Sequence, residues 1–136
     1  MKASSLSFQA AVLFVIAGMI WGIQMAISQD HSAFPAHAHL NLLGWVSLFL
    51  IGFYYRLHPK LDHSRAALAQ VSIWCFATIV LAVGVGLVHT GHMAGDPIAA
   101  IGSLLILADM LMFGWLVVKT ERAPAAQEQQ AMQPAE

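Results

Sequence analysis

The sequence predicts an all-α membrane protein in which four transmembrane helices form a bundle. Apolar residues make up 59% of the 136 residues, charged residues make up only 10%, and the mean hydropathy is +0.70. An ordinary soluble domain is about half apolar and a quarter charged. Four stretches of the chain each supply the roughly 20 mostly apolar residues that one helix needs to cross a bilayer.

The four expected spans cover residues 8–28, 40–57, 66–88 and 97–118. The second span begins a few residues earlier, near Pro35, because a proline suits the first helical turn, where its missing N–H costs nothing. Pro97 starts the fourth span in the same way, with Asp96 as its N-cap. Pro59 closes the second span.

Strands and a cleaved signal peptide are the two alternatives to four transmembrane helices. Strands are excluded because open sheet edges are not tolerated in lipid and because the segments lack the alternation of a barrel strand. The first segment follows Lys2 closely, so a cleaved signal peptide is the other possibility. We expect an uncleaved helix, since the apolar run is longer than a typical signal peptide's and no convincing small-x-small cleavage site follows it.

The orientation follows from the positions of the lysines and arginines. They occur only at the N-terminus, between the second and third spans, and after the fourth: Lys2, Arg56, Lys60, Arg65, Lys119 and Arg122. The loops at residues 29–38 and 89–96 contain none. Short loops rich in these residues stay cytoplasmic, so both termini are expected in the cytoplasm.

Composition also divides the chain and excludes some functions. We expect a transmembrane domain at residues 1–122 and a disordered polar tail at residues 123–136, which has little to bury. The net charge of -1 gives no basic surface for nucleic acid. The single cysteine, Cys75, excludes a disulfide framework and any CxxC metal site.

Histidine is the unusual residue, with seven in a chain that has six lysines and arginines. His58 and His63 fall in the cytoplasmic loop, and the other five fall at the outer end of the bundle: His31, His37, His39, His89 and His92. Ionisable groups near membrane depth are expensive and are often functional. Single interfacial histidines usually bond to headgroups and water, but a group around one rim favours a metal or heme site.

The spacing of the histidines narrows their roles. At about 100° per residue, His37 and His39 point about 200° apart, so they do not easily bind the same iron. His89 and His92 share a face only if the helix continues past Gly91. Neutral imidazole suits iron, copper and zinc alike. We expect cofactor or metal binding at His37, His39, His89 and His92, and the lack of CxxCH excludes the usual covalent c-type heme.

The small and polar residues near these histidines each have two possible roles. Gly44, Gly84 and Gly86 permit close approach of a flat ring, but they equally permit tight helix packing. Asn41 lies one turn beyond His37 and is placed to hydrogen-bond a ligand or a neighbouring group.

Two glycines and one aspartate inside the spans bear on assembly and on proton transfer. Gly18 and Gly22 form a Gly-x-x-x-Gly pair that suits a homodimer or packing within one chain. Asp109, in the fourth span, is either a proton-relay group or a carboxyl hydrogen-bonded inside the bundle.

One helix carries a family resemblance. Its residues read His37-Ala38-His39-Leu40-Asn41-Leu42-Leu43-Gly44-Trp45 and continue through Gly52-Phe53-Tyr54-Tyr55-Arg56-Leu57-His58-Pro59. This run resembles the His-x-His helix of the heme–copper oxidase catalytic subunit, especially in C-type oxidases and their small membrane relatives. It covers less than a fifth of the chain. The resemblance implies that His37 corresponds to the ligand of the oxygen-reducing heme and His39 to the ligand of the low-spin heme.

The departures from that family limit the expected function. The chain has far fewer spans than a full catalytic subunit, and it lacks the histidine–glutamate–tyrosine motif and the adjacent histidine pair that hold copper. A complete oxygen reductase is therefore not expected. We expect a membrane b-type heme protein for electron transfer or for redox or gas sensing, with copper as a further candidate. The alternatives are a heme-free copper or zinc protein and a structural or assembly subunit.

The sequence also predicts the membrane in which the protein lies and its oligomeric state. We expect an integral protein of a bacterial inner membrane, with the histidine cluster at the outer face. A homodimer in the lipid bilayer is the expected assembly, and the sequence does not identify the redox partner.

Overall fold

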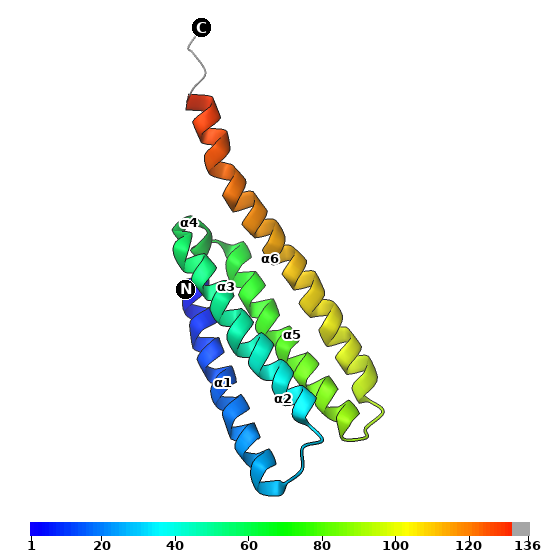
Figure 1. The fold of residues 1–136 in the computed structure, drawn as a ribbon. Coiled ribbons are helices and arrows are strands. Elements are labelled where there is room, and N and C mark those ends of the chain that lie inside the picture. The colour runs from blue at the N-terminus through cyan, green and yellow to red at the C-terminus, as the bar shows by residue number, and fades with distance from the viewer. Residues whose placement is uncertain (132–136) are drawn as a thin grey trace.

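The computed structural model describes residues 1–131, with side chains described through residue 122, and those residues form helices joined by short loops (Figure 1). No strand occurs in this part of the chain. The elements are α1 (Ala3–Ser28), α2 (Phe34–Asn41), the π-helix η1 (Leu42–Ser47), α3 (Leu48–Leu57), α4 (Pro59–Asp62), α5 (Arg65–His89) and α6 (Gly95–Ala131).

Four helices are long and apolar enough to cross a membrane, which confirms the predicted number of spans. They are Ala3–Ser28, the continuous Phe34–Leu57, Arg65–His89 and Gly95–Arg122, with 26, 24, 25 and 28 residues. At 1.5 Å per residue the shortest is about 36 Å long, more than a hydrocarbon core of about 30 Å requires. These spans indicate an integral membrane protein.

The helix boundaries differ in detail from the sequence prediction. Pro35 lies in the first turn of α2, as expected. Pro59 follows the end of α3 and also begins the short helix α4. The fourth helix begins at Gly95, so Asp96 lies in its first turn and is not its N-cap. The predicted tail begins inside α6, which continues through Ala131, and residues 132–136 lie outside the described residues.

Helix α1 begins earlier than expected because a distant carboxylate caps it. The Ser4 N–H donates to Asp62 Oδ1 at 2.7 Å, and the Ser4 hydroxyl donates to Asp62 Oδ2 at 2.8 Å. Asp62 is only 3% exposed. A carboxylate at a helix N-terminus pairs with free N–H groups and with the positive end of the helix dipole. This contact fixes the start of α1 to α4.

The spans pack side by side, with α1 and α6 at opposite edges (Figure 1). Helix α1 packs on α2, η1 and α3, and α6 packs along α5. Buried side chains of α3 and α5 meet in the centre, among them Leu48, Tyr55, Val71 and Trp74. The core therefore lies between α1, α3 and α5.

Glycines bring α5 and α6 into backbone contact. A Cβ added to Gly84 would lie 2.6 Å from the Ala99 Cα, and one added to Gly102 would lie 2.6 Å from the Leu81 Cα. Such contacts are typical of membrane helices that pack through small residues. Of the two roles predicted for Gly84, the structure therefore shows helix packing.

The bundle has two chemically different ends. We call the end with the α1–α2 and α5–α6 loops the histidine end, because it carries His31, His37, His39, His89 and His92. We call the opposite end, with the N-terminus and α4, the basic end, because Lys2, Arg56, Lys60, Arg65, Lys119 and Arg122 lie there. Figure 1 shows the N-terminus beside α4, far from the α5–α6 loop.

Candidate functional site

The histidine end brings together residues from three elements that are distant in sequence. His37 and His39 lie on α2, His89 is the last residue of α5, and His92 lies in the loop to α6. His31 lies in the exposed loop before α2. Helix α2 packs against α5, where Ala36 lies near Gly86. The order of the spans therefore puts the predicted site residues at one end of the bundle.

The His37 ring faces α1. Its Cε1 would lie 3.2 Å from a Cβ added to Gly22. The Asn41 amide nitrogen lies 3.2 Å from His37 Nε2 and donates to the His37 carbonyl at 2.9 Å. Asn41 in turn lies against Gly18, where an added Cβ would be 2.7 Å from its Nδ2. The Gly18 and Gly22 pair thus accommodates two polar side chains of α2 within this chain.

His39 has a different arrangement. The ring is half-buried, and Nδ1 lies 2.7 Å from the Pro35 carbonyl oxygen. A carbonyl only accepts hydrogen bonds, so this contact requires the proton on Nδ1. In the neutral ring, Nε2 then carries the free lone pair, which is the atom a metal would bind.

His89 repeats this pattern at the end of α5, and His92 does not. The His89 Nδ1 lies 2.9 Å from the Val85 carbonyl oxygen, which leaves Nε2 with the lone pair. His92 is exposed, with Nδ1 3.1 Å from the Thr90 hydroxyl. Gly91 separates the two histidines with a φ of 82°, a left-handed conformation that ends the regular helix. The shared helical face that a continuous helix would give is therefore not formed.

The candidate donors at this end are single imidazole nitrogens. Among the side chains that the structure describes, no three His, Cys, Asp or Glu groups lie close enough to hold a metal ion. Protein zinc sites need three or four such ligands, whereas a heme takes only its axial ligands from the protein. His39 and His89 each present one ring nitrogen with a free lone pair.

A π-helix follows the His-x-His segment, and sequence reasoning missed it. The wider turn at Leu42–Ser47 rotates the side chains of α3 about the helix axis, relative to the positions that a regular α-helix after His39 would give them. Side chains bond the carbonyls in and after it: Trp74 Nε1 donates to the Leu43 carbonyl at 3.0 Å, and Ser7 donates to the Leu48 carbonyl at 2.6 Å. π-Helical turns occur frequently at functional sites, and this one begins three residues after His39.

Asp109 belongs to a buried polar chain that joins three helices. Tyr55 in α3 donates to Gln70 Oε1 in α5 at 2.8 Å, and Gln70 Nε2 donates to Asp109 Oδ2 in α6 at 2.6 Å. Asp109 is only 2% exposed. Of the two predicted roles, a carboxyl hydrogen-bonded inside the bundle agrees with these contacts.

His58 makes a separate contact at the basic end. Its Nδ1 lies 2.8 Å from the Tyr54 carbonyl oxygen, and its Nε2 lies 3.3 Å from Glu121 Oε1. Tyr54 also donates its hydroxyl to Glu121 Oε1 at 3.1 Å. Both partners of the ring are acceptors, so both contacts form together only when the ring carries two protons. This contact joins α3 to α6.

Comparisons with protein-family models, with curated proteins and with solved structures found no match to this chain. A role for these histidines therefore depends on the local geometry and on the resemblance of residues 37–59 to the His-x-His helix.

Proposed function

We propose that this chain is a membrane b-type heme protein that transfers electrons or senses a redox state or a diatomic gas. The observation that carries the proposal is the His39 ring, whose Nδ1 bonds to the Pro35 carbonyl so that Nε2 has a free lone pair. His39 is also the residue that resembles the low-spin heme ligand of the oxidase helix. A bound heme would supply one-electron transfer or gas binding at its iron.

His89 is the best candidate for a second ligand. It lies at the same end as His39, and its Nδ1 bonds to the Val85 carbonyl in the same way. His37 remains a candidate ligand by resemblance, but its ring has to leave Gly22 and Asn41 before it binds iron. His92 is the least constrained of the four, because it lies in a loop beyond the end of α5.

The residues around His39 have a positioning role in this proposal. The Pro35 carbonyl fixes the tautomer and the ring orientation of His39, as second partners of ligating histidines do. Contact between Ala36 and Gly86 holds α2 against α5, and thereby sets the separation between the two candidate ligands. The spans that adjoin the histidine end are apolar, and in this proposal their side chains keep water away from the bound heme.

The proposal includes an orientation and an assembly. The six-to-none distribution of Lys and Arg supports cytoplasmic termini and a histidine end on the outer side, as expected for a bacterial inner membrane. The proposed homodimer uses a surface other than Gly18 and Gly22, because those glycines contact α2 of the same chain. A C-terminal alkaline phosphatase fusion should be inactive, and an active one contradicts the orientation.

The test compares two histidine variants of the full chain, purified in mild detergent after expression with sufficient heme. We expect His39→Ala to lower heme occupancy or to change a low-spin spectrum to high-spin. His63→Ala is the matched control, because His63 is exposed at the basic end, and its spectrum should stay that of the wild type. Metal analysis of the same samples measures copper. Equal heme content and spin state in both variants would reject His39 as a ligand.

A further inference from the structure

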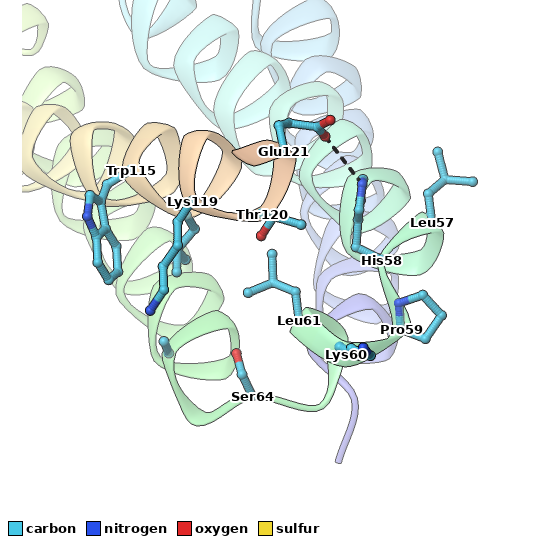
Figure 2. A pocket seen from close by; sticks show the side chains of 12 residues that line it. Leu57, His58, Pro59, Lys60, Leu61, Ser64, Trp115, Lys119, Thr120 and Glu121 are labelled. Atoms are coloured by element: carbon cyan, nitrogen blue, oxygen red, sulfur yellow. Dashed lines mark ion pairs between the residues drawn. The ribbon is translucent and has the colours of Figure 1, made fainter. Parts of the chain in front are cut away.

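A cavity opens at the basic end, which is the opposite end of the bundle from the histidine end. Its volume is about 600 Å³, within the usual range of ligand pockets. Helix α4 and the start of α5 form one side, and residues 115–121 of α6 form the other (Figure 2). The two sides come from segments about 55 residues apart, so the cavity depends on the docking of α6.

The cavity is amphipathic. Leu61 and Leu116 supply apolar surface, and Lys60 and Lys119 supply positive charge. The Lys119 ammonium lies 4.9 Å from the ring centroid of Trp115, and Figure 2 shows both side chains on the same side of α6. A second cavity of about 390 Å³ shares Trp115 and Lys119 with the first. Lys119 therefore lines both cavities.

The one carboxylate among the residues lining the larger cavity is already paired. Glu121 contacts His58 Nε2 at 3.3 Å and the Tyr54 hydroxyl at 3.1 Å. Figure 2 shows this pair on one side of the cavity, with Leu61 between it and Lys119. Among the side chains that the structure describes, Lys60 and Lys119 of the lining form no ion pair, so their positive charge complements an anion.

The depth of the cavity indicates what kind of anion it would meet. The apolar run of α6 ends at Val118, so Trp115 and Lys119 lie where apolar residues give way to charged ones. Tryptophan and lysine are typical of the level at which lipid headgroups meet the hydrocarbon. A ligand there meets apolar surface on the membrane side and positive charge on the water side. A phospholipid has these two parts in that order.

We infer that this cavity binds a phospholipid with an anionic headgroup. The headgroup phosphate pairs with Lys119 and Lys60, and the upper acyl chains lie against Trp115, Leu61 and Leu116. Such a lipid contacts α4, α5 and α6 at once and thereby stabilises the docking of α6. The inference is independent of heme binding, since its residues lie at the other end of the bundle.

The test is a lipid titration of the full-length, delipidated protein, followed by native mass spectrometry. The probes are dioleoyl phosphatidylglycerol and dioleoyl phosphatidylcholine, which differ in headgroup charge and share their acyl chains. The first phosphatidylglycerol should bind at least fivefold more tightly than the first phosphatidylcholine. Lys119→Gln should weaken phosphatidylglycerol binding about fivefold, the effect expected for one lysine beside an anionic lipid. Lys60→Gln, which leaves the Trp115 contact intact, should also weaken it.

Lys2→Gln is the matched control. Lys2 is exposed at the same end but does not line either cavity, so its replacement should change binding less than twofold. Equal losses for Lys119→Gln and Lys2→Gln would overturn the proposal in favour of general charge attraction. Equal affinity of the wild type for the two lipids would also overturn it. Displacement of the lipid by excess inorganic phosphate would indicate a simple anion site and would equally reject it.

Discussion

Gly84→Ala tests the packing of α5 on α6 at its closest point. The added methyl would lie 2.6 Å from the Ala99 Cα, whereas carbon atoms in contact prefer about 3.5–4.0 Å. The obstructing atoms belong to the α6 backbone, so the helix itself must move. Overpacking typically costs about 1–3 kcal/mol, and alanine returns about 1 kcal/mol of helix propensity. We expect a net destabilisation of up to about 2 kcal/mol.

The assay is the free energy of unfolding in mixed detergent micelles, followed by circular dichroism. Gly86→Ala is the matched control, because an added Cβ there would lie 3.5 Å from the Ala36 Cβ, an ordinary contact. It should leave stability unchanged or raise it by up to about 1 kcal/mol. Gly102→Ala should behave like Gly84→Ala, since the Leu81 backbone lies equally close. A Gly84→Ala protein as stable as Gly86→Ala would refute the packing derived for α5 and α6.

Three further predictions concern charged groups in the loops or near the helix ends. Asp62→Asn should lower the free energy of unfolding by about 2 kcal/mol, because Ser4 loses a buried charged acceptor, and chemical unfolding checks this value. The Ser32 N–H donates to Asp30 and lowers the pKa of its carboxyl, so an NMR titration should give a value below 3.8. The associated stabilisation is present above the ordinary pKa and is lost as the pH falls through the lowered one. Glu121→Gln should change the melting temperature little, because the carboxylate is exposed and such pairs contribute at most about 1 kcal/mol.

Hydropathy and charge were sufficient to predict the number of spans and the shared end of five histidines, His31, His37, His39, His89 and His92. Both depend on properties summed over many residues, which a single sequence displays directly. The start of α1 could not be predicted in this way. It depends on Asp62, which lies 58 positions from Ser4 and caps the helix only after the chain has folded.

The site was predicted less completely, for two physical reasons. The angle of about 200° between His37 and His39 follows from helix geometry, but the neighbour of each ring depends on how α2 docks. The Gly-x-x-x-Gly pattern predicts either a dimer contact or packing within one chain, and in the structure Gly18 and Gly22 accommodate Asn41 and His37 of the same chain. In the π-helix after His39, Trp74 of α5 donates to the Leu43 carbonyl and Ser47 donates to the Leu42 carbonyl. The contact with Trp74 forms only when the helices dock, so no local pattern reveals it.

The heme-to-protein ratio of the wild-type chain tests the central proposal most directly. The protein would be expressed with sufficient heme, purified in mild detergent and passed through size-exclusion chromatography, and its heme would be measured by extraction and absorbance. The account predicts non-covalent heme b that co-elutes with the protein at a constant ratio and gives a Soret band. Protein that elutes folded, without heme and without a Soret band, would contradict it.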